Sequence, residues 1–452
     1  MRVTALPRSV AEMRRFHIEP GGTLNGTLEV PGDKSVSHRA IMFSAIARGR
    51  SRITGFLESA DCLATLGAFE VMGVSFTRDG GALLVDGVGR DGLSAPDATL
   101  DLGNSGTSMR LLSGLMAGQA FDSVLGGDAS LSRRPMARVI DPLTEMGARI
   151  AGSDGQRAPL HITGGQRLRG IDYTPPVASA QIKSCVLLAG LYAEGATTVH
   201  EPGISRDHTE RMLGAFGVEL TREGRALSIT GGQSLEAFDV AVPADLSSAA
   251  FFLVGASIGE NGELTLTGVG VNPTRRGVVD ILKRMGADIT LVDEREQAGE
   301  PVADITVRSA ALRGIDIGAT DVELAIDELP AIFIAAACAH GTTRLTGAAE
   351  LRVKESDRIA VMADGLAELG IEVTVQDDGL TIVGRPEQHS FGGGHIHSHE
   401  DHRIAMSFAM AGLRASAPIV IDDCDFVDTS FPGFVERARN AGLAIESQEH
   451  DA

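Results

Sequence analysis

The 452-residue sequence is poor in several residue types: it contains no tryptophan, two tyrosines and four cysteines. Proteins that bind single-stranded nucleic acid stack bases on aromatic side chains, so this scarcity argues against an RNA-processing enzyme. The cysteines lie far apart and form no CxxC motif, which favours free buried thiols over disulfides or a metal site. We therefore expect a protein of the reducing cytoplasm.

Long apolar segments are also absent from the sequence. The longest candidates, Leu246–Ile258 and Leu329–Ala339, are shorter than the roughly 18 residues that span a bilayer, so we interpret them as buried core helices. The first 16 residues carry four arginines but no apolar segment typical of a secretory signal. They predict a short disordered extension, and no membrane association is expected.

Basic residues are in the minority: 40 Lys and Arg stand against 60 Asp and Glu, which gives a formal net charge of −20. Such a charge repels nucleic acid and anionic membranes. Places where Lys and Arg gather are therefore informative, because they indicate a local pocket for anions. The length itself predicts two domains of about 200 residues each.

One pattern occurs six times along the chain. A helix-like segment ends in a glycine and is followed by a short alternating strand, around Gly73, Gly147, Gly217, Gly286, Gly370 and Gly442. Glycine suits a helix C-terminus because it adopts the left-handed conformation without penalty. A further strand closes each of the first five units, but the sixth unit lacks it. Phe16–Pro20 is the candidate to supply that strand, which would place both termini in one domain.

The strands alternate polar and apolar residues, whereas the helix that leads into each unit is apolar nearly all round. This predicts an α/β protein made of two inverse α/β barrels, with helices inside, sheets outside and three repeats in each domain. We expect one domain to comprise residues 1–31 and 244–452, and the other residues 32–243. The alternative is one long α/β domain with accidental periodicity.

Basic and small polar residues gather at predicted helix starts in the first half. PGDKSVSHRA places Lys34, Ser35 and Arg39 where free helix N–H groups favour an anion. LGNSGTSMR has glycines that let the backbone approach a phosphate or carboxylate. Each segment is also compatible with an ordinary helix cap. The other candidates here are Asn104, Gly106, Thr107, Arg134 (expected to point inward, unlike Arg133), Ser179, Gln181 and Arg206, whereas His208 is expected to be structural.

The second half carries a denser set of acids and bases. AIDELPAIF contains Asp327, LRVKESDRI contains Lys354, Glu355 and Arg358, and EDHRIAM contains Arg403. The alternatives are a favourable helix dipole or a solvated run of charges. Loops at equivalent positions of stacked repeats converge on one face, so two such faces predict one interdomain cleft lined by Lys and Arg. The residues alone indicate a transferase or lyase acting on phosphorylated carboxylates.

Eight segments, taken in order, resemble the EPSP synthase family of enolpyruvyl transferases: GDKSVSHRA, LGNSGTSMR, SLSRRPM, ASAQIKS, SRDHTERM, IDELPAI, LRVKESDR and DHRIAMS, between about Pro31 and Pro432. The resemblance implies two domains with three βαβαββ units each. It implies attack of the 5-hydroxyl of shikimate 3-phosphate on C2 of phosphoenolpyruvate, protonation of C3 and loss of phosphate from a tetrahedral ketal. It also implies no metal or other cofactor, small-molecule partners only, and a monomer.

The resemblance also implies residue roles. Phosphoenolpyruvate would be bound by Lys34, Asn104, Gly106, Thr107, Arg134, Gln181, Lys354, Arg358 and Arg403. Shikimate 3-phosphate would be bound by Lys34, Ser35, Arg39, Ser179, Gln181, Arg206, Asp327 and Lys354. Asp327, near the attacking hydroxyl, and Glu355, near the methylene carbon, would carry protons with help from Lys34. A buried carboxylate with a near-neutral pKa would serve both directions of transfer.

Some positions depart from the family pattern. Many members have two serines before the glutamine, whereas this chain has Ser179-Ala180-Gln181. Thr429 stands where many members have a basic residue. These changes resemble herbicide-tolerant relatives, whereas Gly106 is typical of glyphosate-sensitive ones, and we expect measurable inhibition by glyphosate. The alternatives are the sister enzyme that uses UDP-N-acetylglucosamine, which has Lys-Asn in place of Lys34-Ser35 and a loop cysteine, and a non-catalytic anion-binding protein.

Overall fold

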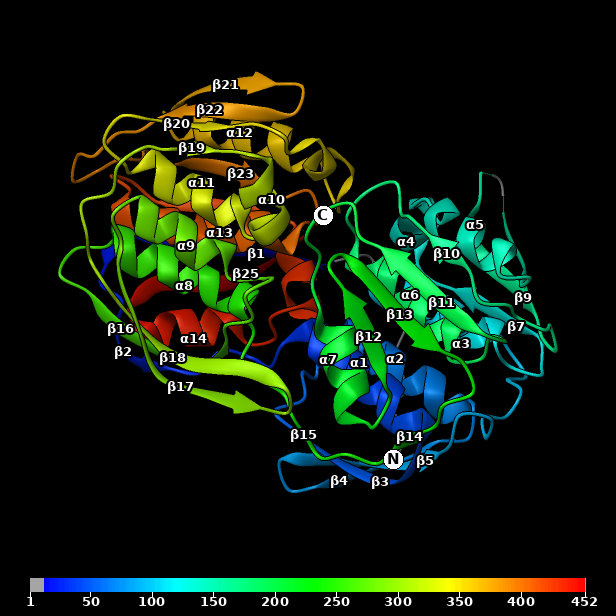
Figure 1. The fold of residues 1–452 in the computed structure, drawn as a ribbon. Coiled ribbons are helices and arrows are strands. Elements are labelled where there is room, and N and C mark those ends of the chain that lie inside the picture. The colour runs from blue at the N-terminus through cyan, green and yellow to red at the C-terminus, as the bar shows by residue number, and fades with distance from the viewer. Residues whose placement is uncertain (1–11, 154, 452) are drawn as a thin grey trace.

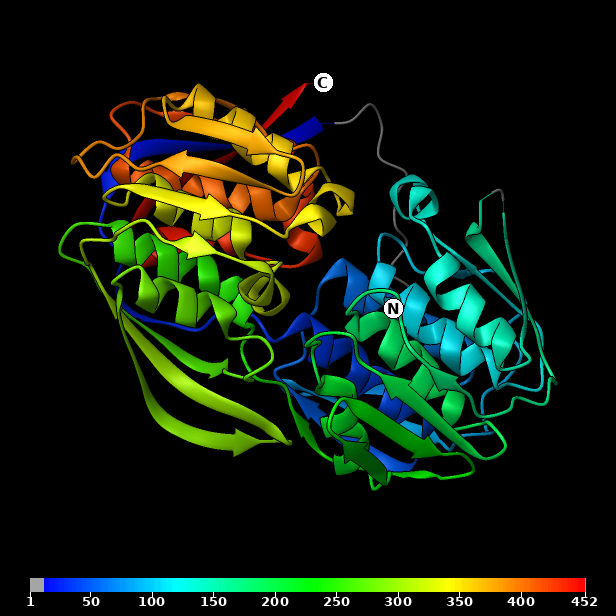
Figure 2. The ribbon, with the colours of Figure 1, turned by 45° about the horizontal axis from the view of Figure 1, so that its top comes forward.

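The computed structural model describes residues 12–153 and 155–451, which form two lobes (Figures 1 and 2). The first lobe has a hydrophobic core drawn from residues 36–242, and the second has a core drawn from residues 16–30 and 244–445. We propose that these cores mark two domains with the boundaries expected from the sequence. Residues 1–11 of that division lie outside the described residues.

The strands of the described residues form six sheets with one shared topology. In each sheet a parallel pair of neighbouring strands is extended by antiparallel strands. In the first lobe the orders are β6 (Leu100–Asp101), β7 (Ser123–Gly126), β9 (Arg157–Thr163), β8 (Arg149–Ser153); then β10 (Asp172–Tyr173), β11 (Ala196–His200), β13 (Ala226–Thr230), β12 (Leu220–Glu223); then β14 (Leu235–Glu236), β3 (Ala47–Thr54), β5 (Ala82–Val88), β4 (Ser75–Asp79), with β15 (Val240–Ala241) also on β3.

The second lobe repeats this arrangement. Its orders are β2 (Asn25–Leu28), β16 (Glu263–Gly270), β18 (Glu300–Arg308), β17 (Asp288–Gln297); then β19 (Asp316–Ile317), β20 (Thr342–Leu345), β22 (Gly379–Val383), β21 (Glu372–Gln376); then β23 (Gly394–His397), β24 (Ile419–Asp422), β1 (Glu12–Gly22), β25 (Leu443–Asp451). The prediction of six repeated units in an inverse α/β fold is confirmed.

Each lobe encloses three inner helices. They are α1 (Lys34–Ile46), α3 (Gly106–Ala117) and α6 (Ala180–Gly190) in the first lobe, and α8 (Leu246–Ile258), α11 (Leu329–Ala337) and α13 (His402–Ala411) in the second. Every residue of α8 and α11 is buried, which agrees with their apolar sequences. In the second lobe the three inner helices pack against one another, so the core lies inside the ring of sheets.

The inner helices of the first lobe approach closely where glycine permits it. A Cβ added to Gly114 of α3 would lie 2.2 Å from the carbonyl oxygen of Cys185 on α6, which is far inside van der Waals contact. Gly67, in the outer helix α2 (Ala60–Val71), would meet nothing within 4 Å. The close contact between α3 and α6 therefore depends on the missing side chain of Gly114.

Six outer helices are each followed by one of the predicted glycines: α2, α5 (Ala137–Glu145), α7 (His208–Ala215), α9 (Gly277–Arg284), α12 (Arg358–Glu368) and α14 (Phe434–Ala441). All six glycines, from Gly73 to Gly442, have φ between 86° and 117°. Side chains are strained in this region, so glycine ends each helix and turns the chain into the next strand. This part of the sequence prediction is confirmed.

Strand β1 completes the sixth sheet. Phe16 is paired with Ile421 of β24 on one side and with Ser447 of β25 on the other, and the blue strand lies beside the red one in Figure 2. The predicted strand at Phe16–Pro20 is therefore correct but longer than expected. The expectation of a disordered extension is wrong for residues 12–16, because backbone pairing to β25 continues to Glu12. Residues 1–11 of that extension are outside the described part.

The chain crosses between the lobes twice, and the two crossings are paired. The amide of Asp33 donates to the carbonyl of Pro243 at 2.8 Å, and the amide of Asp245 donates to that of Pro31 at 2.8 Å. Arg275, which is 4% exposed, binds the carboxylates of both Asp33 and Asp245. Burial and the charge of Asp33 raise the pKa of Asp245, whereas Arg275 lowers the pKa of Asp33 in spite of its burial. One guanidinium thus holds the two crossings together.

No helix in residues 12–153 or 155–451 is both long enough and apolar enough to cross a membrane. This agrees with the short apolar segments of the sequence.

Candidate active site

The inner helices begin at the boundary between the lobes. Asp33 caps α1 by accepting from the amide of Val36, and it also binds Arg275 of the other lobe. Asp401 caps α13 by accepting from the amide of Arg403. The opposite end of α8 is covered by Arg414, whose Nη1 donates to the carbonyl of Ile258 at 2.9 Å. The partly positive ends of these helices therefore face the boundary, where they favour anions.

Arg134 and Arg110 flank the backbone of Gly106 in the first lobe. Arg134 donates to Oδ1 of Asn104 at 2.8 Å. A Cβ on Gly106 would lie 3.0 Å from Nη1 of Arg110 and 3.1 Å from Nη1 of Arg134. Burial, aided by the charge of Arg134, lowers the pKa of Arg110 to about 10, so it remains cationic at neutral pH. Arg133 is exposed, as predicted, whereas Arg134 is directed inward.

Gln181, on α6, connects that helix to α3, which carries Gly106 and Arg110. Its Oε1 accepts from Arg110 at 2.7 Å, and its Nε2 donates to Oγ1 of Thr107 at 3.0 Å. Ser179 caps α6 by accepting from the amide of Ile182. These contacts bring the predicted residues of the LGNSGTSMR and ASAQIKS segments to one surface of the first lobe.

Arg358 organises the facing surface of the second lobe, although its side chain is 1% exposed. Its Nε donates to Asp401 at 2.7 Å, and its Nη2 donates to Oε2 of Glu355 at 2.7 Å. Its Nη1 lies 3.6 Å from Asp327, forms no hydrogen bond among the described residues, and is buried. The carboxylates outweigh burial and raise the pKa of Arg358, so it is a permanent cation with one donor group unused.

Asp327 and Glu355 are both held ionised. Burial raises the pKa of Asp327, but Arg206, Arg403 and nearby cations outweigh it and hold that pKa well below its usual range. For Glu355 burial acts in the same way, and the charges of Arg358 and Arg134 lower its pKa well below 4.5. The expected near-neutral pKa is therefore wrong for these carboxylates without ligands, because several cations lie close to each of them.

Four ion pairs or hydrogen bonds connect the lobes around these groups. Arg206 of the first lobe pairs with Asp327 of the second, and Arg134 lies 3.5 Å from Glu355. Arg138 pairs with Glu350 at 3.1 Å. Lys34 donates to Ser430 at 3.0 Å and also pairs with Asp61 of its own lobe. We call the set Lys34, Arg134, Arg206, Asp327, Lys354, Glu355, Arg358 and Arg403 the interlobe site.

Comparison with known proteins shows the family of this chain. A family model described as EPSP synthase (3-phosphoshikimate 1-carboxyvinyltransferase) matches residues 18–438. The chain belongs to the EPSP synthase family. It is 63% identical to the 3-phosphoshikimate 1-carboxyvinyltransferase of Alkalilimnicola ehrlichii, over 95% of this chain and 96% of that protein, and 60% identical to that of Halorhodospira halophila, over 96% and 98%. The EPSP synthase structure from Acinetobacter baumannii superposes with a TM-score of 0.88 at 56% identity, covering 96% of this chain and 100% of that one.

Other predicted residues of this family member lie around the same boundary. Arg39 is 2% exposed and donates to Thr209, Ser184 and the carbonyl of Ser35, which places it beneath the first turn of α1. Arg403 donates to the carbonyl of Asp327 at 2.9 Å. Burial lowers the pKa of Lys354. The structural role predicted for His208 agrees with its buried contact to Glu300 at 2.7 Å.

Three residues at this boundary were missed in the sequence. Arg110 follows Gly106 by four positions in a helix, and this spacing, which puts both on one face, identifies it in retrospect. Asp61 lies in the first turn of an outer helix, and Ser430 lies in a loop near the C-terminus. No local pattern marks these two, because each acquires its partner, Lys34, only through the fold.

Proposed function

We propose that this chain transfers the enolpyruvyl group of phosphoenolpyruvate to the 5-hydroxyl of shikimate 3-phosphate, releasing phosphate. Relatives up to 63% identical carry the name 3-phosphoshikimate 1-carboxyvinyltransferase. The observation that carries the proposal most directly is the pair of ionised carboxylates, Asp327 and Glu355, surrounded by cations from both lobes. Two polyanionic substrates need such cations, and proton transfer to and from carbon and oxygen needs the carboxylates.

The cations account for substrate binding. Arg134, Arg358 and Arg403 converge from two lobes with fixed guanidinium groups, which suit phosphate and carboxylate oxygens. Arg358 has an unused donor at Nη1. In our proposal these residues hold phosphoenolpyruvate, together with Lys34, Lys354 and the Gly106 backbone. Ser35, Arg39, Ser179, Gln181 and Arg206 hold shikimate 3-phosphate.

Asp327 is suited to the first proton transfer. Its lowered pKa makes it a carboxylate at neutral pH, so it is available to accept a proton rather than donate one. The bound substrate anions offset the cations that depress this pKa, which makes Asp327 a stronger base in the complex. As the 5-hydroxyl oxygen bonds to C2 of phosphoenolpyruvate, its proton passes to Asp327. The nearby Arg206 pairs with Asp327 and so fixes its orientation.

Glu355 is suited to the proton transfers at C3, provided that bound ligand changes its surroundings. An anion on Arg358 and Arg134 offsets the cations that depress the pKa of Glu355, so that pKa rises when phosphoenolpyruvate binds. Protonated Glu355 then donates to C3 and gives the tetrahedral ketal phosphate. In the second step Glu355 takes a proton back from the methyl group, the C2–O bond to phosphate breaks, and the enol ether forms. Lys34 assists by stabilising the departing phosphate.

The two alternatives lack support in the chain. The UDP-N-acetylglucosamine enzyme has a cysteine in its substrate loop, whereas all four cysteines here are buried, and burial raises the pKa of each thiol. A binding protein without catalysis has no use for two carboxylates held among the ligand-binding cations. We further propose that the protein acts in the cytoplasm, in keeping with its free cysteines, and that it is a monomer, as the family resemblance implies.

Phosphate release tests this function. Purified protein receives shikimate 3-phosphate and phosphoenolpyruvate together, and then each alone. We expect release only with both substrates, and its loss in Lys34→Ala. Release that requires UDP-N-acetylglucosamine instead of shikimate 3-phosphate, or no release with either acceptor, would contradict the proposal.

A further inference from the structure

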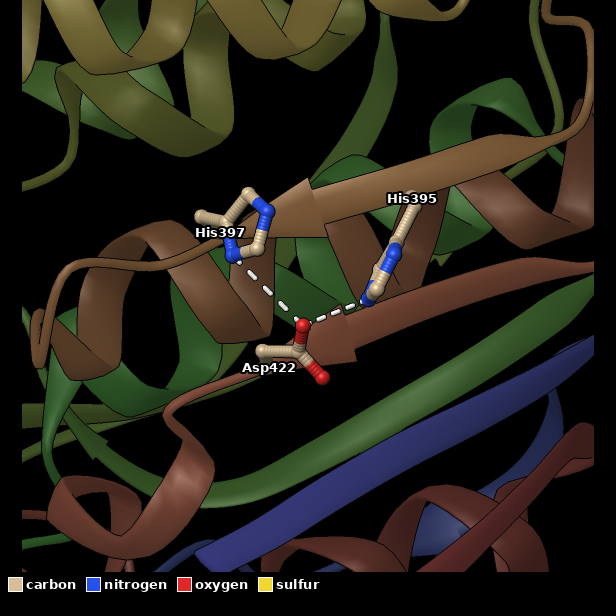
Figure 3. A group of neighbouring side chains, drawn as sticks. All are labelled: His395, His397 and Asp422. Atoms are coloured by element: carbon tan, nitrogen blue, oxygen red, sulfur yellow. Dashed lines mark ion pairs between the residues drawn. The ribbon is translucent and has the colours of Figure 1, made fainter. Parts of the chain in front are cut away.

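Two histidines and an aspartate meet on the outer sheet of the second lobe, apart from the interlobe site. His395 and His397 alternate along β23, so both side chains leave the strand on one face. β24 runs parallel beside β23, and Asp422, its last residue, is paired with His397. Figure 3 shows ion pairs from both imidazole rings converging on the Asp422 carboxylate.

The distances between the three side chains suit a small metal ion once the two imidazole rings rotate slightly. Nε2 of His395 is 2.5 Å and Nδ1 of His397 is 3.5 Å from the same oxygen, Oδ2 of Asp422. One ligand atom from each residue lies within 4.8 Å of the other two. Zn²⁺ binds such atoms at about 2.0–2.2 Å, which places tetrahedral ligands about 3.3 Å apart. The two rings are 47% and 62% exposed, so small rotations bring them to that spacing.

A contact with Arg15 helps to orient the carboxylate of Asp422. Nε of Arg15, on β1, donates to Oδ1 at 2.6 Å, while Oδ2 is the oxygen nearest the two histidines. Such bonds to the far oxygen of a metal-binding carboxylate fix its orientation.

From this geometry we propose that His395, His397 and Asp422 bind one divalent ion of the late first transition row, represented by Zn²⁺. Zinc, copper and nickel bind imidazole nitrogens well, whereas magnesium and calcium select oxygen ligands. The three side chains supply three ligands, and water supplies the rest. A third imidazole, that of His399, has its ring centroid 6.4 Å from that of His397 and adds to the local density of nitrogen ligands.

The ion joins β23 to β24 at a point directly connected to the interlobe site. Ser398 follows His397, and its hydroxyl donates to the carbonyl of Asp423 at 3.0 Å. The amide of Asp401 donates to the carbonyl of Ser398 at 3.0 Å, and Asp401 in turn binds Arg358. Bound metal therefore braces the turn that leads to α13, and it stabilises the folded chain because the unfolded chain does not hold the three ligands together.

Zn²⁺ titration by calorimetry tests the site on full-length protein without a histidine tag, after removal of metal, at pH 7.5. We expect one ion per chain and a rise in Tm with Zn²⁺. His395→Ala, His397→Ala and Asp422→Asn should each weaken binding by roughly tenfold or more. The matched control is His161→Ala, an exposed histidine on β9 of the other lobe, which should bind as the parent does.

Circular dichroism and phosphate release without metal establish that each variant is folded. His395 is exposed and outside the catalytic set, so His395→Ala is the variant on which the outcome rests. No stoichiometric binding to the parent, or unchanged binding to His395→Ala, would overturn the proposal. Unchanged binding to Asp422→Asn would also overturn it, because two neighbouring histidines would then suffice without the carboxylate.

Discussion

Replacing Glu355 by glutamine separates proton transfer from ligand binding at the interlobe site. Glutamine retains the size and two hydrogen-bonding groups of Glu355 but neither its charge nor its exchangeable carboxyl proton. Glu355 accepts from Arg358 at 2.7 Å and lies 3.5 Å from Arg134, so the substitution leaves both guanidiniums less neutralised. We expect a slower reaction with binding of phosphoenolpyruvate that is no weaker than in the parent.

Both magnitudes follow from the proposed roles. General acid–base catalysis contributes about 10²- to 10⁴-fold, so kcat should fall by that factor. A substrate anion on the far side of the guanidiniums lies about 8 Å from Glu355, where the repulsion of two unit charges is about 2 kcal/mol at an effective dielectric constant of about 20. Removing this repulsion lowers the KM for phosphoenolpyruvate by up to about 30-fold.

Steady-state phosphate release at varied phosphoenolpyruvate measures both constants. Glu350→Gln is the matched control, because Glu350 belongs to the same segment and also pairs with an arginine of the other lobe. Its side chain is 39% exposed, and such a pair contributes about 1 kcal/mol at most, so both constants should change by less than about fivefold. An unchanged kcat with a raised KM in Glu355→Gln would refute the reasoning and leave Glu355 with a binding role alone.

The same variant has a predictable effect on stability. The folded pKa of Glu355 is depressed, so its ionised form stabilises the protein above the usual value of 4.5, and this contribution disappears as pH falls through the folded pKa. Glu355→Gln should therefore unfold at lower denaturant than the parent at pH 7, and the difference should shrink below pH 4.5. A difference that grows as the pH falls would mean that the pKa of Glu355 is raised in the folded protein.

Three further substitutions test other parts of the structure. Gly114→Ala should destabilise the chain by about 1–3 kcal/mol in denaturant unfolding because of the close helix contact, whereas Gly67→Ala should stabilise it by up to about 1 kcal/mol; equal effects would contradict the packing argument. Arg275→Met should destabilise the chain by about 3–5 kcal/mol because it leaves buried carboxylates uncompensated, whereas Arg276→Met, at a partly exposed neighbour, should cost less than about 1 kcal/mol. Stability of Arg275→Met equal to that of the parent would mean that the two crossings do not depend on this guanidinium. Gly106→Ala should weaken glyphosate inhibition of phosphate release, since the added methyl group displaces two guanidiniums by a few tenths of an ångström, and inhibition equal to that of the parent would count against this.

Local sequence determined the repeated elements of this protein. Segments that are apolar nearly all round identified the enclosed helices, and a glycine that follows each outer helix marked where a strand begins, because both depend on residues that are neighbours along the chain. The positions of Lys34, Asp327 and Glu355 at or just before helix starts were also visible in short segments, whereas Arg134 follows the end of α4 (Ala129–Arg133). Strand β1 was identified only in part, since its length depends on pairing with residues more than 400 positions away.

The tertiary structure decided the partners across the lobes and the charge state of Asp327. Nothing in the local sequence places Arg206 of one lobe beside Asp327 of the other, yet Arg206 contributes most to reversing the effect of burial on that carboxylate. For Glu355 the largest such contribution comes from Arg358, three positions along the chain, and the distant Arg134 adds to it. The meeting of His395 and His397 with Asp422 was likewise invisible before β23 and β24 were paired. Electrostatic effects and ligand geometry depend on distances through space, and in this chain the decisive distances join residues far apart in sequence.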